Sequence, residues 1–323
     1  MYSEGWYFLM PSRSVKKGKL VGTELFGIEI VIFRTESGFI RALDAFCPHM
    51  GAHLKEGRVE KESIRCFFHR WCFDSTGSCV DIPSKTSGLA NQIKTNPWTV
   101  VDHLGLIWIW LGNNSPTDLP LPMDLVGVSV KHKMTSSFEK KCHPHVVLVN
   151  AIDEQHFKSV HWISIPLKME SHRRSENIIS FRNVHGIQTK SILGKILFRI
   201  YKGQPIHYQL TYWPGNAGTV TLGPGFFRLY LLFALRLSAD GGTIGHMIAL
   251  TPAKSSLFAK IFNQLVLFIT LFAGKYFALG DTKIFESIRF NLAHPLQDDR
   301  AIVDFIRFVE DQPFHMCRNV NEI

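Results

Sequence analysis

The feature that most constrains this chain of 323 residues is a set of two cysteines and two histidines in two short stretches. Cys47 and His49 form a Cys-x-His pair. Sixteen intervening residues separate it from Cys66 and His69, which form a Cys-x-x-His pair. Two thiolates and two imidazoles in this spacing suit one [2Fe–2S] cluster, with the cysteines on one iron and the histidines on the other. A zinc site or a set of unrelated core residues would also contain such side chains. Zinc sites favour Cys-x2–4-Cys paired with His-x3–5-His, however, and neither half here has that form.

The sequence around these four residues is typical of β-structure. Residues 20–34 and 38–46 are rich in β-branched and aromatic side chains, and the second stretch leads into the first ligand loop. Residues 58–65 frame a hairpin that leads to Cys66, and residues 100–112 form a further strongly β stretch. We therefore expect an all-β N-terminal domain that clamps the cluster between two loops.

A proline-rich stretch marks the end of this domain. Residues 113–122 contain three prolines together with Asn, Ser and Asp, a composition typical of linkers. A chain of 323 residues also has the length of two ordinary domains. We predict a first domain over residues 1–115 and a second over residues 116–323.

The second half mixes helices and strands. Helical character is expected around residues 146–160, 255–290 and 299–310, and residues 176–252 read as several strands separated by turns. Strands grouped together and flanked by helices indicate an α+β fold.

A second metal-binding pattern lies at the start of this half. Asp153, His156 and His161 form Asp-x2-His-x4-His. On a helix, His156 lies one turn beyond Asp153, whereas His161 needs a break or the helix end to converge with His156. Two histidines and a carboxylate with open positions form the facial triad of non-haem Fe(II) oxygenases. Taken alone, a His-x4-His pair is more often a pair of ordinary surface or core histidines.

These motifs resemble those of the Rieske non-haem iron oxygenases. Residues 47–83 resemble the Rieske domain of that family, and the run from Phe68 to Trp71 stands where the family usually has a Tyr-His-Gly-Trp-like run. Rieske proteins of respiratory chains carry an extra disulfide between the two ligand loops. Ala52 and Phe68 occupy the matching positions here, so that bridge cannot form. The resemblance is therefore to the oxygenase type of cluster.

The resemblance continues into the second half. Asn150, Asp153, His156 and His161 match the family's Asn-x2-Asp-x2-His-x4-His signature. It implies a helix-grip (START-like) catalytic domain, with an antiparallel sheet and flanking helices, that holds a mononuclear Fe(II) and uses O2 as co-substrate. It also implies catalytic roles for Asn150 and Asp153. In the family, the acid that matches Asp153 bridges a cluster histidine of one subunit and an iron histidine of the next, so the resemblance implies a homotrimer.

The third iron ligand is expected to be a carboxylate near the C-terminus. In the family it stands in a pattern like Asp-x-x-Ile-hydrophobic-acid. Asp299 fits this spacing, because Ile302, Val303 and Asp304 follow it, and Asp298 is the next candidate. The resemblance thus predicts iron held by His156, His161 and Asp299.

The activity that the resemblance implies is that of a terminal oxygenase component. Residues 47–54 look most like the steroid hydroxylase and sterol desaturase branch, which predicts hydroxylation or desaturation of a bulky hydrophobic ring substrate, sterol-like or polycyclic. Residues 71–79 look more like the branch that acts on chlorophyll-type tetrapyrroles. Because no dinucleotide fingerprint is present, electrons are expected from a separate ferredoxin or flavin reductase. The sequence also leaves open a Rieske electron-transfer protein without oxygenase activity and a zinc-stabilised binding module.

Composition and charge bear on location and partners. The net charge is +9, but Lys and Arg are scattered, which favours an acidic electron donor and no nucleic acid. Cys72, Cys79, Cys142 and Cys317 read as reduced thiols, and no signal peptide is evident, so we expect a cytoplasmic protein.

One apolar segment, within residues 257–279, raises the question of a membrane. The uncharged stretch between its lysines is 14 residues, shorter than the ~18–20 that span a bilayer. We predict a buried helix. The alternative is a helix that makes peripheral contact with a membrane or roofs an apolar substrate channel.

Overall fold

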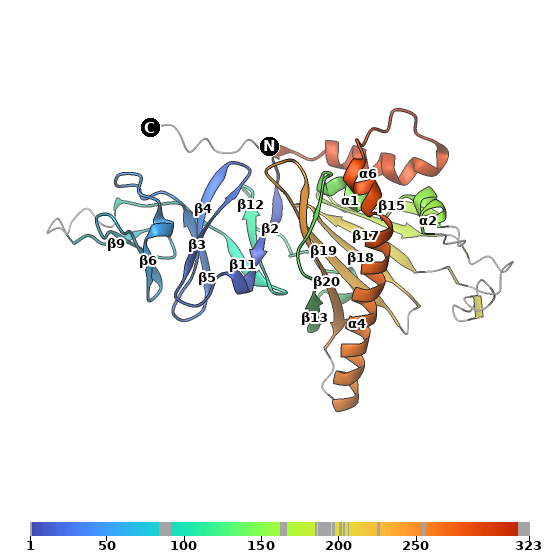
Figure 1. Ribbon diagram of the computed structural model, residues 1–323, viewed down its shortest axis with the longest axis horizontal. Coiled ribbons are helices and arrows are strands. Elements are labelled where there is room, and N and C mark those ends of the chain that lie inside the picture. Colours follow the sequence, from blue (N-terminus) through green and yellow to red (C-terminus); the bar gives the residue numbers. More distant parts are fainter. Residues whose placement is uncertain are drawn as a thin grey trace. The chain divides into compact units, whose positions relative to one another are not determined.

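The computed structural model describes residues 2–83, 92–161, 167–184, 207–224, 227–253 and 256–315, with isolated residues between 185 and 206. The chain divides into two units (Figure 1), one formed by Met1–Pro116 with the C-terminal strand and the other by Thr117–Pro313. The predicted boundary lies beside this division. The strand β21 (Phe314–His315) pairs with β1 (Tyr2–Ser3), however, so the chain returns to its first unit, whereas the predicted second domain ran to residue 323. Two residues are too short a run to signal a strand in the sequence.

The first unit is built from short antiparallel strands in separate sheets. One sheet has the order β10-β5-β4-β3, a second β11-β12-β2 and a third β6-β7-β8-β9. The elements are β2 (Gly5–Pro11), η1 (Ser12–Ser14), β3 (Leu20–Leu25), β4 (Ile28–Arg34), β5 (Ile40–Asp44), η2 (Leu54–Glu56), β6 (Arg58–Glu60), β7 (Ser63–Arg65), β8 (Cys72–Phe73), β9 (Cys79–Asp81), β10 (Pro97–Trp98), β11 (Val100–His103) and β12 (Leu106–Leu111).

Strand β4 explains how this small unit maintains two cores. Successive side chains of a strand point to opposite faces. Ile30 and Ile32 pack with β12, while Val31 and Phe33 pack in the core that contains Cys47 and Cys66. All four β4 side chains are fully buried, which is why the sequence here is a continuous apolar run without alternation.

The second unit is an antiparallel sheet with helices on one face. The strand order is β13-β20-β19-β18-β17-β16-β15, and β14 also pairs with β20. Its strands are β13 (Val130–Met134), β14 (Phe138–Lys140), β15 (Met169–Ser175), β16 (Ile178–Asn183), β17 (Tyr208–Trp213), β18 (Ala217–Leu222), β19 (Leu229–Leu237) and β20 (Thr243–Pro252). Its helices are η4 (Met123–Leu125), α1 (Pro144–Val149), α2 (Glu154–Ser159), α4 (Leu257–Gly280), α5 (Thr282–Ser287), η5 (Gln297–Asp299) and α6 (Arg300–Glu310). The predicted α+β class is confirmed.

Register shows that the helices share one face of this sheet. Leu210, Val220, Leu231 and Ala249 are directly paired across β17, β18, β19 and β20, so their side chains point to the same side. This row packs against α1, α2 and α6 toward one end and against α4 toward the other. Helices and sheet thereby enclose a space between them, and that space holds the second metal site.

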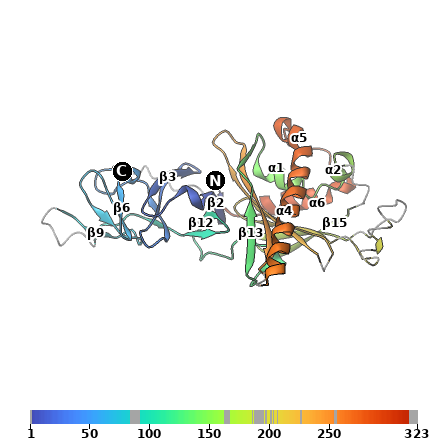
Figure 2. The same ribbon diagram turned by 60° about the horizontal axis from the view of Figure 1, so that its bottom comes forward.

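Helix α4 runs beside β20 (Figure 1 and Figure 2). It begins at Ser256, whose hydroxyl accepts a hydrogen bond from the Ala259 N–H at 3.2 Å, and it ends at Asp281. Leu267 and Leu271 pack against Met247 and Ala249 of β20. The helix was predicted, but the prediction that it is buried holds for one face only, because its outer face is exposed.

Candidate metal centres

The four cluster residues lie in two loops that follow strands, as predicted. Cys47 follows β5, and its N–H donates to the Ala52 carbonyl at 2.9 Å. Cys66 lies between β7 and β8, and its N–H donates to the Trp71 carbonyl at 2.8 Å. Each loop is thus closed on itself by a backbone hydrogen bond. These hydrogen bonds hold the backbone of each loop that carries the ligand side chains.

The donors in these loops separate by type. Cys47 and Cys66 are 3% and 2% exposed, whereas His49 and His69 lie at the surface. The two imidazole rings are 4.5 Å apart between centroids, and the His49 ring stacks on Trp71 at 4.1 Å. Burial raises the pKa of the Cys47 thiol to about 11, so ligation has to displace its proton. Buried thiols beneath exposed imidazoles fit a [2Fe–2S] cluster with its cysteine iron inside and its histidine iron facing the surface.

The other cysteines agree with an oxygenase-type cluster. Ala52 and Phe68 offer no sulfur for a bridge between the loops. Cys72, Cys79 and Cys142 are buried free thiols, and Cys317 lies outside the described residues. Cys72 and Cys79 lie on the strands beside the ligand loops, where they serve as small apolar core residues.

Arg70 marks a departure from the family pattern. It stands where the family usually has glycine, and its φ of 64° lies in the left-handed region that favours glycine. The Arg65 guanidinium donates to the Arg70 carbonyl at 2.6 Å and holds this turn in place.

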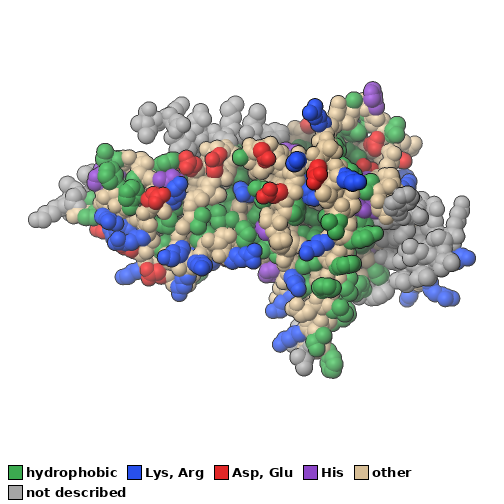
Figure 3. All heavy atoms as spheres, in the orientation of Figure 1, with side chains coloured by type: hydrophobic (Ala, Val, Ile, Leu, Met, Phe, Trp, Pro, Cys, Tyr) green, Lys and Arg blue, Asp and Glu red, His purple; other side chains and the backbone are tan. Residues whose placement is uncertain are grey.

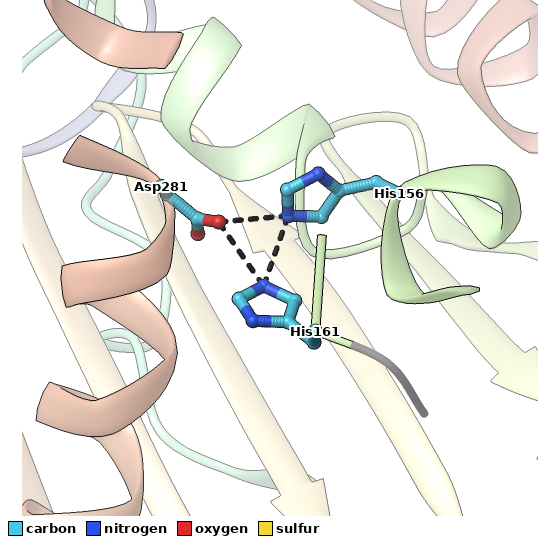
Figure 4. A group of neighbouring side chains, drawn as sticks. All are labelled: His156, His161 and Asp281. Carbon is cyan, nitrogen blue, oxygen red and sulfur yellow. Dashed lines mark hydrogen bonds and ion pairs between the residues drawn. The ribbon is translucent and has the colours of Figure 1, made fainter. Parts of the chain in front are cut away.

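Three side chains converge in the second unit to form the mononuclear site. His156 comes from α2, His161 follows that helix, and Asp281 stands at the junction of α4 and α5 (Figure 4). The Nε2 atoms of His156 and His161 are 3.0 Å apart, and the Asp281 Oδ1 atom lies 2.8 Å from the first and 3.0 Å from the second. The break after α2 that His161 needs is present.

This geometry fits a divalent transition metal. Bonds of about 2.1 Å at right angles place neighbouring donor atoms about 3.0 Å apart, close to the distances between these three atoms. The Asp281 Oδ1 atom is buried, and among the described residues the two imidazole nitrogens are its only polar neighbours, as expected of an atom that shares a metal with them. Burial lowers the pKa of His161, which favours the neutral imidazole that binds metals. The site is a two-histidine, one-carboxylate facial triad, the arrangement that non-haem Fe(II) uses.

The structure corrects the predicted carboxylate ligand. The Asp299 Oδ2 atom accepts the Leu296 N–H at 2.8 Å, and its Oδ1 atom accepts the Gln155 side-chain amide at 3.3 Å. Asp299 therefore stabilises the short helix η5, directly before α6, instead of joining the triad. Asp298, the second candidate, is exposed. Asp281 takes the predicted role.

The signal that would have found Asp281 is present in the sequence. Asp281, Ile284, Phe285 and Glu286 also satisfy Asp-x-x-Ile-hydrophobic-acid, so the spacing that selected Asp299 occurs twice. Asp299 was preferred because it lies nearer the C-terminus, but Asp281 carries the copy of the pattern that reaches the histidines. Only the fold shows that the end of α4 lies over the α2 histidines.

Asn150 and Asp153 both act on the histidine ligands. The Asn150 amide nitrogen lies 2.9 Å from His156 Nε2, on the side where the three donors meet. The Asp153 Oδ1 atom accepts the N–H groups of Gln155 and His156 at 2.9 and 3.0 Å and thereby caps α2. Asp153 thus positions the helix that carries His156. Its bridging role between subunits stays a prediction.

A cavity of about 650 Å³ adjoins the triad. Its lining is mainly apolar and comes from α1, α2, α4, α5 and the facing strands. Lining residues include Phe138, Val220, Leu231, Phe233, Met247, Phe277 and Phe285. Its polar groups are few, and among them the Lys140 ammonium donates to the Thr282 hydroxyl at 3.3 Å. The volume falls within the range of about 300–1,000 Å³ that is usual for small-molecule sites.

His145 has a structural role near this centre that predicts a pH dependence. It lies 3.0 Å from the Tyr212 hydroxyl and packs edge-on against Phe305, and burial lowers its pKa to about 3. Between pH 6.5 and 3 the unfolded state binds a proton that the folded state does not, so the contribution of neutral His145 is lost as pH falls below 6.5.

We expect His145→Gln to reduce the slope of unfolding free energy against pH between about 6 and about 4.5 by up to about 1.4 kcal/mol per pH unit. Denaturant titrations at several pH values measure this slope. His172→Gln is the matched control, because His172 is exposed on β15 and is not in contact with His145. An unchanged slope in the His145 variant would contradict the assignment.

Comparison with known proteins agrees with the cluster site. Residues 5–97, which include all four cluster residues, match the Rieske [2Fe-2S] domain family. The chain is 33% identical over 165 residues to cholesterol 7-desaturase of Drosophila melanogaster, and 32% identical over 168 residues to the oxygenase component of 3-ketosteroid-9-alpha-monooxygenase of Rhodococcus rhodochrous. Each match covers 50% of this chain but only 38% and 43% of those relatives.

Solved structures share the fold of nearly the whole chain. NdmB of Pseudomonas putida CBB5 superimposes with a TM-score of 0.67 over 94% of this chain and 88% of its own, at 17% identity. Dicamba monooxygenase bound to 3,6-dichlorosalicylic acid gives a TM-score of 0.66 over 95% and 96%, at 18% identity. Fold and ligand sets together define a two-centre iron protein. Residues 5–97 therefore belong to the Rieske [2Fe-2S] domain family, and the chain is similar in sequence to the oxygenase component of a steroid monooxygenase and to a sterol desaturase.

Proposed function

We propose that the chain is the terminal oxygenase component of a system that hydroxylates or desaturates a bulky hydrophobic ring substrate of sterol-like size. The observation that carries this proposal is the apolar cavity of about 650 Å³ with the His156, His161 and Asp281 donors in its wall. The relatives named above act, by their names, on cholesterol and a 3-ketosteroid. Electrons come from a separate ferredoxin or flavin reductase.

The residues of the chain position the reaction instead of performing redox chemistry themselves. When bound, the iron of the triad supplies O2 activation and the [2Fe–2S] cluster supplies electrons. His156, His161 and Asp281 occupy one side of the metal position and leave the cavity side open to substrate. Apolar side chains such as Leu231, Phe233 and Met247 exclude water, which protects a reactive centre from side reactions.

A polar end of the substrate has a partner in the same cavity. The Lys140 side chain lies 5.6 Å from the Phe285 ring centroid and beside Thr282. A ring substrate with one hydroxyl or keto group fits this set, because its oxygen accepts from the ammonium while its carbon skeleton contacts the apolar wall. A small charged substrate would leave most of this apolar lining without a partner.

The active assembly that we propose is a homotrimer. Asp153 lies at the start of the helix that carries His156, where family resemblance gives an acid the role of linking the iron site to a neighbouring subunit's cluster. Exposed His49 and His69 make the cluster accessible to such a contact. Asp153→Asn is expected to keep both metals and lose nearly all coupled turnover.

The substrate class is tested by O2 uptake with a surrogate reductase and a panel of compounds. We expect uptake and oxidised product with steroid and polycyclic substrates, and none with small aromatic carboxylates. The Asp281→Ala variant is the control for uptake at the mononuclear site. Turnover confined to small charged aromatics would refute the proposed substrate class and leave the assignment of the two iron centres standing.

A further inference from the structure

Helix α4 presents a continuous apolar face to solvent. On this face the exposed fraction of the large apolar side chains ranges from 38% to 87%. At about 100° per residue they fall within an arc of about 120°, so they form one stripe along the helix. We call this stripe the α4 outer face; it comprises Phe258, Ile261, Phe262, Leu265, Phe268, Ile269, Phe272, Tyr276 and Leu279.

The opposite face of α4 is fixed to the sheet. Leu267 and Leu271 pack against β20, and the Asn263 side-chain amide donates to the Pro252 carbonyl at 3.1 Å. The segment Phe258–Gly280 is long and apolar enough to cross a membrane, and 33% of its most apolar part is buried. Because one side of the helix packs along the sheet, α4 suits a position in the plane of a membrane surface better than a crossing.

The charged side chains on α4 all have one sign. No acidic residue occurs in α4, and Lys260 and Lys275 are exposed on one side of the stripe. Lys131 and Lys133 are exposed on β13, which packs beside α4. Figure 3 shows hydrophobic side chains along α4 with Lys and Arg side chains next to them. Apolar side chains bordered by lysines are the pattern of helices that bind anionic lipid surfaces.

The α4 outer face is continuous with the cavity at the metal site. Leu279 is 75% exposed and also lines the cavity. Lys275 is likewise exposed and lines the cavity. Phe277, two residues before Leu279, packs edge-on against the His161 ring at 5.0 Å between centroids, so the last turn of α4 contacts both solvent and the metal site. A molecule dissolved in a lipid layer against this face would reach the cavity along apolar side chains.

We propose that the α4 outer face docks the protein onto a lipid bilayer. Protein–protein interfaces carry about one hydrogen bond per 100–200 Å², whereas this stripe offers only the Tyr276 hydroxyl as a side-chain polar group. Its apolar surface and cationic edge match a bilayer that contains anionic lipid. The further step, delivery of an apolar substrate from the bilayer into the cavity, rests on the proposed function.

Vesicle flotation of the full chain tests docking. The wild type is expected to float with phosphatidylcholine vesicles, and more strongly when about a fifth of the lipid is phosphatidylserine. The triple variant Phe258→Ser, Phe268→Ser, Phe272→Ser is expected to weaken binding more than about tenfold. A matched control removes exposed apolar side chains elsewhere in the chain, as Phe39→Ser, Val126→Ser, Leu296→Ser, and is expected to float like the wild type.

One more variant and one readout complete the test. Lys260→Gln with Lys275→Gln is expected to lower binding to anionic vesicles and leave binding to neutral vesicles unchanged. A wild type that stays unbound overturns the proposal. A triple variant that only turns an oligomer into a monomer also overturns it, and assigns the face to a second copy of the chain. Substrate-dependent O2 uptake with a steroid carried by cyclodextrin is expected to be equal in wild type and triple variant, so it reports on the proposed function separately.

Discussion

Replacing Asp281 with alanine is expected to remove the mononuclear iron and leave the cluster intact. The carboxylate supplies one of three protein donors, and its Oδ1 atom lies 2.8 and 3.0 Å from the two imidazole Nε2 atoms. Even changes to residues that only support metal ligands weaken metal binding by about 10–100-fold, so loss of a ligand should exceed this. Iron content is expected to fall from about three to about two atoms per chain, and O2-dependent turnover should be abolished.

Asp299→Ala is the matched control for this experiment. It removes an acid that has the same sequence pattern but whose side chain accepts hydrogen bonds from Leu296, at the start of η5, and from Gln155. It is expected to lower stability through the loss of helix-terminal hydrogen bonds and to keep about three irons per chain. If Asp299→Ala lost the mononuclear iron and Asp281→Ala kept it, the assignment of the triad would be wrong.

Replacing Cys66 with alanine is expected to destroy the cluster and spare the mononuclear site. Cys66 is 2% exposed and shares its core with Cys47 and Phe73. Because binding free energy of a metal centre is also folding free energy, the first unit should lose stability together with the cluster. The visible absorbance and the electron paramagnetic resonance signal of the reduced protein should vanish, and about one iron per chain should remain.

Cys72→Ala separates the loss of a ligand from the loss of a buried thiol. Cys72 is 4% exposed and lies on β8, in the same sheet as the strand that leads to Cys66, but stands outside the four-residue pattern. This variant is expected to keep the cluster signal and about three irons per chain. Loss of the signal in Cys72→Ala, or its survival in Cys66→Ala, would contradict the ligand set.

The elements that the sequence predicted best are those with dense local signals. The cluster residues are close in sequence, and a strand leads into each ligand loop, so motif and local structure agree. The histidines of the mononuclear site are five residues apart and share one segment. The β4 strand was recognisable because both of its faces are buried, which gives a continuous apolar run.

What the sequence did not predict depends on long-range packing. Asp281 stands more than a hundred residues after His161, and two copies of its spacing compete in the sequence. Only the sheet and α4 decide between them. The exposure of the α4 outer face was missed for a related reason, since a long apolar run has the same composition whether it is buried on one side or on all sides. The pairing of β21 with β1 likewise has no local signal.

The measurement that tests the central claim most directly is the ratio of iron to acid-labile sulfide in the purified wild-type chain, read beside its electron paramagnetic resonance spectrum. A chain with one [2Fe–2S] cluster and one mononuclear iron is predicted to contain about three irons and about two sulfides and to give a Rieske-type signal on reduction. About two irons and two sulfides would instead describe an electron carrier, and zinc without sulfide would describe a structural metal module. Either result would contradict the two-centre account.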